Sequence, residues 1–250
     1  MSMLEVNELY VRLGSRRVIG GASFEINEGL TMLLGRNGCG KSTLIRALLG
    51  LIPSKGRIAF RGSDITALNS RRRAQLMAYL PQRQTIPAGI SVLEYAALGG
   101  YARGGLLASP GRESYDAASA ELDRAGIAHL KGRMLTEVSG GEARLAGLAR
   151  ARVQKSPLML MDEPLAGLDI AKQHEFLAQV KADGFSILMS LHDPMLAWRY
   201  ADRLLVMDEG GISAFTREDE AAFEKKLTLI YGAGMRFEQV GDMRLPIWHD

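Results

Sequence analysis

Residues 35–43 read Gly-Arg-Asn-Gly-Cys-Gly-Lys-Ser-Thr. This stretch matches the pattern G-x-x-x-x-G-K-[ST], whose glycines let successive backbone N–H groups point at phosphate oxygens. An apolar run, residues 30–34, precedes it, and a helical run follows it as far as Gly50, so strand, glycine loop and helix come in the required order. The pattern predicts a nucleoside triphosphate site in which Lys41 reaches the β- and γ-phosphates and the Ser42 hydroxyl ligates Mg²⁺. The residues expected to surround the phosphates are Gly35, Asn37, Gly38, Cys39, Gly40, Lys41, Ser42 and Thr43.

Composition places the chain among globular proteins of ordinary type. It has 250 residues, of which 47% are hydrophobic and 24% charged. No apolar run approaches the roughly 20 residues that cross a bilayer, and the N-terminus lacks a signal segment, so we expect a cytoplasmic location. The single cysteine, Cys39, excludes an internal disulfide or a cysteine-cluster zinc site. The net charge of +3 does not indicate nucleic acid as a partner, and the run Arg71, Arg72, Arg73 is expected to form a solvated helix face.

The distribution of apolar residues predicts an α/β fold with additions. Near-continuous apolar runs at residues 157–162, 186–191 and 203–207 are typical of strands buried on both faces, and helical spacing lies between them. Shorter β-type stretches at 9–13, 22–26 and 56–60, divided by the turn-prone pairs Gly14-Ser15 and Gly20-Gly21, predict a small flanking sheet. The fold class expected is therefore a P-loop NTPase (RecA-like) parallel sheet with a flanking antiparallel β subdomain.

A helical subdomain is expected within this core. Alanine-rich helical segments at residues 92–98, 113–125 and 141–153 dominate between 90 and 154, where no buried strand is evident, and the glycine-rich stretch 99–105 is expected to be a flexible loop. We therefore divide a single domain, residues 1–250, into a nucleotide-binding core with its β subdomain (about 1–89 and 155–215), a helical subdomain (about 90–154) and a C-terminal tail (216–250).

Two acidic residues follow the run 158–161. Because parallel α/β sheets place ligands at the carboxyl ends of strands, we expect Asp162 in the Mg²⁺ shell and Glu163 beside the water that attacks the γ-phosphate. A structural alternative is an acidic helix cap after the strand.

A Ser-Gly-Gly-Glu run at residues 139–142 lies between the glycine loop and this acidic pair. By itself it is a capping box that opens a helix. With the other motifs it resembles the signature sequence of the ATP-binding-cassette (ABC) ATPases. Gln82 resembles the Q-loop of that family, residues 166–169 (Ala-Gly-Leu-Asp) its D-loop, and His192 its switch histidine.

The resemblance implies specific roles for these residues. ATP would lie between two head-to-tail copies of the chain, so that Ser139, Gly140, Gly141 and Glu142 of one copy contact the γ-phosphate held by the other. Gln82 would ligand Mg²⁺ or hold the attacking water, and His192 would donate to the γ-phosphate. Asp169 would reach the opposite site, and Glu163 would be the general base, assisted by Lys41.

The sequence departs from the family pattern at three positions. Leu13 stands where many members stack an aromatic residue on adenine, and Tyr10, three residues upstream, would point to the opposite face of a strand unless a bulge intervenes, so we expect only a modest preference for ATP over GTP. Glu142 replaces a more familiar glutamine. Cys39, beside backbone amides and a lysine, either has no function or carries a thiol of lowered pKa.

Segments 90–99, 191–202 and 229–232 resemble the cassettes of iron-siderophore, haem and cobalamin importers. This resemblance implies coupling of ATP hydrolysis to metal-chelate uptake through a separate integral membrane permease, fed by a substrate-binding protein, with the chain peripheral on the inner face of the membrane. The alternatives left open are an exporter or lipid-handling cassette and a non-transport ABC ATPase. A second cassette or a large regulatory domain is not expected, because one set of motifs is present and few residues follow Ser213.

Overall fold

A six-stranded sheet in the order β10-β9-β3-β8-β7-β6 forms the centre of the computed structural model, which describes residues 2–84, 86–104, 110–182, 184–209, 211–232 and 234–249. The strands that run parallel are β3 (Leu30–Leu34), β6 (Met77–Leu80), β7 (Leu158–Met161), β8 (Ser186–Ser190) and β9 (Arg203–Asp208). The edge strand β10 (Gly211–Phe215) is antiparallel to β9. Burial on both faces explains the continuous apolar runs of these strands. Each of the five parallel strands carries at least one buried methionine, and these are Met32, Met77, Met159, Met161, Met189 and Met207.

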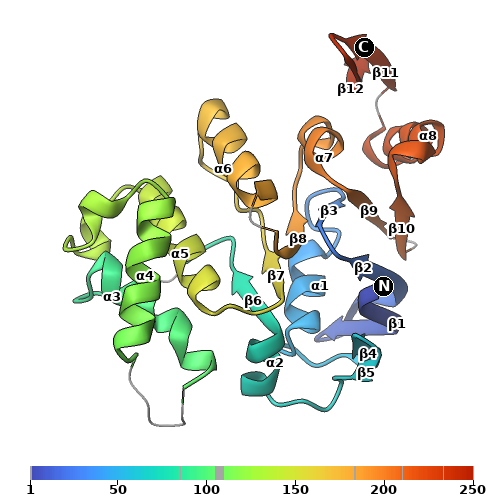
Figure 1. Ribbon diagram of the computed structural model, residues 1–250. Coiled ribbons are helices and arrows are strands. Elements are labelled where there is room, and N and C mark those ends of the chain that lie inside the picture. The colour runs from blue at the N-terminus through green and yellow to red at the C-terminus, as the bar shows by residue number, and fades with distance from the viewer. Residues whose placement is uncertain are drawn as a thin grey trace.

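A second, antiparallel sheet covers one face of the first. Its order is β2-β1-β4-β5, from β1 (Ser2–Leu13), β2 (Arg16–Asn27), β4 (Lys55–Phe60) and β5 (Ser63–Asp64). Helix α1 (Lys41–Leu48) lies between the two sheets (Figure 1), and its Leu44 and Leu48 share a core with Leu33 of β3 and Leu4 of β1. The predicted turn at Gly20-Gly21 is wrong, since both residues lie inside β2. Tyr10 of β1 packs against Gly21, where a side chain would collide with the tyrosine ring.

Helices and a terminal hairpin cover the opposite face. They are α6 (Ile170–Ala182), α7 (Pro194–Tyr200), α8 (Glu220–Tyr231), a 3₁₀ turn at Arg217–Asp219, and the strand pair β11 (Gly234–Val240) and β12 (Met243–His249). Their aromatic side chains share one buried cluster with Met32 of the sheet, and these are Phe176, Trp198, Phe223 and Phe237. The tail predicted for residues 216–250 thus contains a packed helix and hairpin.

A separate group of helices lies beyond β6 at the edge of the sheet (Figure 1). They are α3 (Val92–Ala97), α4 (Arg112–Arg124) and α5 (Gly140–Val153), with 3₁₀ turns at Leu98–Ala102, Ala128–Leu130 and Leu135–Glu137, and they have a core of their own. Among the described residues from 90 to 154, the one β feature is an isolated bridge between Ser91 and Met134. The predicted flexible loop 99–105 is wrong over its first residues, because Gly99 packs against the backbone of Arg150, whereas Gly105 lies outside the described residues. The subdomain boundaries stay a prediction.

The arginine run lies in α2 (Ser70–Leu76), which Asn69 caps. The predicted solvated face is wrong for Arg73, which is buried and donates from its guanidinium to the carbonyl oxygens of Leu48 and Thr66. Separately, no helix in the described parts of the chain has both the length and the apolar character needed to cross a bilayer.

Candidate active site

The glycine loop connects β3 to α1 with a backbone that side chains would obstruct. Gly35 has φ +153°, and a Cβ there would come within 2.5 Å of the Met207 carbonyl oxygen. Gly40, the N-cap of α1, has φ +113° and no side chain to cap the helix, so the first N–H groups of α1 keep their donor capacity. Together with the helix dipole, this arrangement suits a phosphate group.

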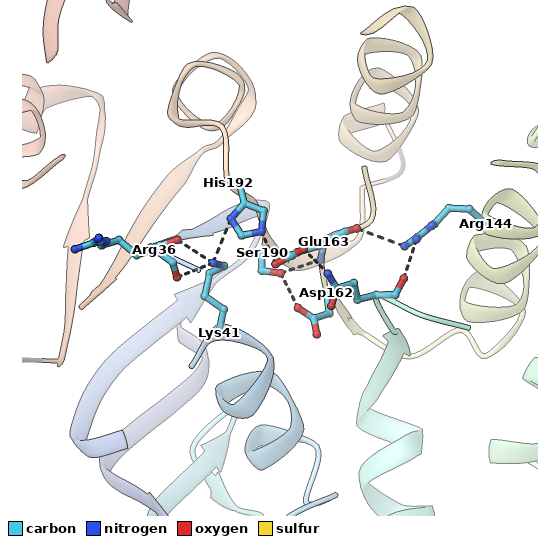
Figure 2. Close-up of polar contacts among 9 residues, drawn as sticks. Arg36, Lys41, Arg144, Asp162, Glu163, Ser190 and His192 are labelled. Carbon is cyan, nitrogen blue, oxygen red and sulfur yellow. Dashed lines mark hydrogen bonds and ion pairs between the residues drawn. The ribbon is translucent and has the colours of Figure 1, made fainter. Parts of the chain in front are cut away.

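Lys41 is buried directly beneath this loop. Its Nζ atom donates to the carbonyl oxygens of Gly35 (2.8 Å) and Arg36 (3.3 Å) and lies 3.5 Å from Nδ1 of His192 (Figure 2). Burial lowers the pKa of Lys41, while the negative charges of Glu163 and Asp162 act in the opposite direction. A buried ammonium group solvated mainly by carbonyl oxygens is well placed to bind an anion.

The acidic pair lies where β7 ends, beside the end of β8. Asp162 is buried and accepts a hydrogen bond from the Ser190 hydroxyl at 2.9 Å, and the same hydroxyl accepts from the Glu163 N–H at 2.8 Å. Within the described residues no lysine or arginine forms an ion pair with Asp162. Glu163 has φ +45°, a left-handed backbone that is uncommon for a residue with a side chain.

The side chain of Glu163 joins two of the predicted functional residues. Its Oε2 accepts from Nε2 of Gln82 at 2.5 Å, and its Oε1 lies 2.5 Å from Nε2 of His192. Because His192 also approaches Lys41, the structure brings Lys41, Gln82, Glu163 and His192 into one cluster beyond the ends of β3, β6, β7 and β8. Figure 2 shows Lys41, Glu163 and His192 of this cluster side by side. Each carboxylate oxygen of Glu163 thus contacts a nitrogen of a neighbouring side chain. Lys41 and Glu163 of the cluster also line a pocket.

That pocket, of about 410 Å³, extends from the glycine loop to the first hairpin. Its lining residues are Leu13, Arg16, Val18, Gly38, Gly40, Lys41, Ser42, Thr43 and Glu163. Leu13 therefore borders the candidate nucleotide pocket, whereas the Tyr10 hydroxyl hydrogen-bonds Glu8 on the outside of the hairpin. An adjoining cavity of about 1010 Å³ contains Asn37 and Cys39 together with Arg16 and Arg36.

The pKa of the Cys39 thiol decides between the two alternatives given for this residue. Partial burial raises the pKa of Cys39, and this effect outweighs the opposing charge of Lys41. A thiol of lowered pKa is therefore wrong for this structure, in which Cys39 packs against the hairpin core as a small apolar residue.

The Ser-Gly-Gly-Glu run opens α5. The Ser139 side chain accepts from the Glu142 N–H at 3.3 Å, and the Glu142 carboxylate accepts from the Ser139 N–H at 2.7 Å, which completes the predicted capping box. Ser139, Gly141 and Glu142 line a separate cavity of about 610 Å³ with Leu168 and Lys172, and Gly140 is the first residue of the helix. Within one chain the structure therefore does not bring this run to the pocket around Lys41. Asp169 caps α6 by accepting from the Lys172 N–H at 2.9 Å, a bond that lowers the pKa of its carboxyl group.

Two residues of the site were not foreseen from the sequence. Ser190 links Asp162 to the Glu163 backbone, and the signal for it was a polar residue that follows the apolar residues 187–189 at the end of a buried strand. Arg144 contacts the backbone of Gln82 and Glu163 from α5, and no local pattern marks it, because its partners are far away in the sequence.

Comparison with known proteins agrees with these features. The family model for the ABC transporter matches residues 19–166. The hemin import ATP-binding protein HmuV of Burkholderia thailandensis is 33% identical over 98% of each chain. The ferric enterobactin transport ATP-binding protein FepC of Escherichia coli is 32% identical over 93% of this chain and 88% of the relative.

Solved structures give the same result. A metal-chelate type ABC transporter in an inward-facing conformation superimposes with a TM-score of 0.83 at 25% identity, over 99% of this chain and 96% of the other. An ATP-binding cassette in its ADP conformation gives a TM-score of 0.81 at 26% identity, over 93% and 98%. These similarities confirm the predicted fold class and an ATP-binding, ATP-hydrolysing activity. This chain belongs to the ATP-binding cassettes of the ABC transporter family.

Proposed function

We propose that this chain powers the uptake of an iron chelate or haem by hydrolysing ATP beneath a separate membrane permease. Support for the cargo class comes from the relatives, since those named for hemin and ferric enterobactin transport align over nearly the whole chain. Cobalamin belongs to the same broad class of metal chelate. The observation that carries the catalytic part is the contact of one carboxylate, that of Glu163, with both Gln82 and His192.

In this proposal Glu163 is the general base that takes a proton from the attacking water. Gln82 and His192 hold the water and the γ-phosphate on either side of it, and Lys41 neutralises charge on the transferred phosphoryl group. The buried position of Lys41 strengthens this last interaction because few water molecules screen it. The N–H groups at the start of α1 bind the remaining phosphate oxygens.

The oxygen ligands that Mg²⁺ prefers are also present. Asp162 is a buried carboxylate without an ion-pair partner among the described residues, and the hydroxyl of Ser42 borders the same pocket as Glu163. We assign Ser42, Asp162 and the amide oxygen of Gln82 as the protein ligands. Bound Mg²⁺ would supply charge neutralisation at the β- and γ-phosphates.

The separation of the two phosphate-binding segments supports a shared site. Lys41 lines one cavity, and Ser139 lines another with Gly141 and Glu142. We therefore assign a head-to-tail dimer in which residues 139–142 and Asp169 of one copy complete the pocket of the other. Its partner would be an integral membrane permease, supplied by a substrate-binding protein, and the dimer would sit on the cytoplasmic face of the membrane.

A substitution of Glu163 by glutamine tests the catalytic assignment. Glu163→Gln keeps the hydrogen-bonding shape but removes the base, so we expect kcat to fall by at least about 100-fold while ATP still binds. Turnover is measured by phosphate release, and dimer formation in ATP and Mg²⁺ by size-exclusion chromatography. The variant is expected to accumulate as an ATP-bound dimer.

The matched control is Glu25→Gln, which changes an exposed carboxylate of β2. It is expected to retain normal turnover. Normal hydrolysis by Glu163→Gln would remove Glu163 from the role of base. The cargo is tested separately, by purifying the chain with its permease and measuring ATPase stimulation by haem, ferric siderophores and cobalamin, and stimulation by none of them would reject uptake of metal chelates.

A further inference from the structure

Arg144 connects α5 to the two loops that carry the catalytic cluster. It lies in the second turn of the helix that begins after Ser139. Its Nη2 donates to the Gln82 carbonyl oxygen at 2.8 Å, and its Nη1 to the Glu163 carbonyl oxygen at 3.4 Å (Figure 2). A single half-buried side chain from the helical group therefore contacts both residues that we place around the attacking water.

The shape of the guanidinium group suits this position. Its donors are fixed in a planar fork, so one arginine can hold two carbonyl groups at a defined separation, whereas a lysine ammonium is a point donor. The two carbonyl groups belong to residues whose side chains hydrogen-bond each other at 2.5 Å. Fixing the two backbones thus also fixes the approach of the Gln82 amide to the Glu163 carboxylate.

The backbone of Glu163 needs such support. Its φ of +45° is unfavourable for a residue with a side chain, and such conformations persist where neighbouring contacts hold them. Ser190 binds its N–H at 2.8 Å, and Arg144 binds its carbonyl oxygen. The peptide units on both sides of this strained residue are therefore held, one from the central sheet and the other from α5.

A second contact joins the same loop to the same helix. The side-chain amide of Gln84 packs against Gly147 of α5, so a larger residue at position 147 would displace it, and Gln84 also accepts a hydrogen bond from the Tyr95 hydroxyl of α3 at 3.0 Å. Gly147 follows Arg144 by three residues and lies on the same face of α5. Residues 82–84 thus rest on α5 at two neighbouring points.

From this arrangement we infer that Arg144 is a positioning residue for ATP hydrolysis, which sets the placement of Gln82 and Glu163 relative to α5. The inference rests on the roles proposed above for these two residues. Because Ser139 caps α5, a displacement of residues 139–142 with this helix would move both backbones through one side chain. The distance between the Gln82 amide and the Glu163 carboxylate would then depend on the position of residues 139–142.

The test is steady-state ATPase kinetics of the full-length chain carrying Arg144→Gln or Arg144→Lys. We expect Arg144→Gln to lower kcat at least about tenfold, with KM and the Kd for ATP within about twofold of wild type, because small misplacements of catalytic groups affect turnover more than binding. Arg144→Lys should recover part of the loss. Arg112→Gln, which removes an exposed arginine at the start of α4, serves as the matched control and should retain wild-type kinetics.

A double-mutant cycle with Gln82→Ala separates positioning from a general loss of stability. If Arg144 acts through Gln82, adding Arg144→Gln to Gln82→Ala should cost clearly less than it costs in the wild-type background. Unchanged kcat in Arg144→Gln, an effect confined to KM, or fully multiplicative losses would each overturn the inference. If Arg144→Gln does not fold, wild-type kinetics of Arg144→Lys would overturn it equally.

Comparing the turnover of wild type, the Arg144 variants and Glu163→Gln shows which of the two proposals has failed. Normal wild-type turnover with unaffected Arg144 variants counts against Arg144 alone. Normal turnover in Glu163→Gln counts against the roles assigned to the cluster, and with them against the positioning of that cluster by Arg144.

Discussion

At the scale of single residues, Glu142 links local folding to pH. Hydrogen bonds from the N–H and the side chain of Ser139 lower the pKa of its carboxyl group. Since the folded-state pKa lies below the unfolded value, the contribution of Glu142 to stability is full above about pH 4.3 and is lost as the pH falls through the folded-state pKa. We expect wild type to lose stability relative to Glu142→Gln, which keeps a neutral capping box, as the pH falls from 6 to 3.5.

Urea unfolding of both proteins at several pH values measures this difference. The equivalent box formed by Ser91 and Glu94 in α3 titrates in both proteins, so it cancels in the comparison. A constant difference between the two proteins across this range would mean that Glu142 does not support α5 through its charge.

Residues with local signals could be assigned from the sequence. Lys41 and Ser139 belong to motifs whose glycines and spacing predict their backbone environment, and both lie at helix starts as expected. Arg144 and Ser190 could not be assigned in this way, because their function is a contact with residues about 20 to 60 positions away, for which a single sequence carries no signal.

At the scale of elements, α2 is attached to the core through Arg73. This buried side chain donates to the carbonyl oxygens of Leu48 at 2.6 Å and Thr66 at 2.8 Å. Its removal leaves both carbonyl groups without these donors, so Arg73→Ala should lower the free energy of unfolding by about 3 kcal/mol. Arg72→Ala, which changes an exposed neighbour, should cost less than about 0.5 kcal/mol.

Chemical denaturation at neutral pH checks this pair of values. Equal effects of the two substitutions would show that the bonds of Arg73 do not anchor α2. The sequence alone predicted the helix after Asn69, but not which arginine turns inward, because three consecutive arginines carry no periodic pattern of their own.

Strands could be predicted from the sequence where a continuous apolar run has clear ends. β3, β7, β8 and β9 are buried apolar runs with clear boundaries. β6 is only four residues long and follows a helix without an intervening turn, so its pattern gave no separate signal. Gly20 and Gly21 suggested a turn, but β2 continues through them since Gly21 provides room for the ring of Tyr10.

At the scale of the whole molecule, the C-terminal hairpin stabilises the helix that follows His192. Phe237 of β11 is buried, and its ring centroid lies 4.6 Å from that of Trp198 in α7. Truncation would leave a cavity between these elements, so Phe237→Ala should lower the free energy of unfolding by about 3 to 4 kcal/mol. Val240→Ala, at an exposed position of the same strand, should have little effect.

Thermal unfolding in the presence and absence of ATP is the appropriate measurement. An unchanged midpoint for Phe237→Ala would indicate that the hairpin packs only loosely on α7. The alternation of buried Met235 and Phe237 with exposed Arg236 and Glu238 was available in the sequence as a strand signal. The packing of Phe237 on Trp198 could not be predicted from the sequence, because that contact depends on the tertiary arrangement.

The buried methionines of the central sheet have a practical consequence for spectroscopy. Each of the five parallel strands carries one or two of them, out of 12 methionines in the chain. The thioether methyl group is flexible and its environment is specific to each strand. Selective ¹³C labelling of methionine methyl groups would therefore place a nuclear magnetic resonance probe in every parallel strand, and any response of the sheet to added nucleotide could be measured strand by strand in the native sequence.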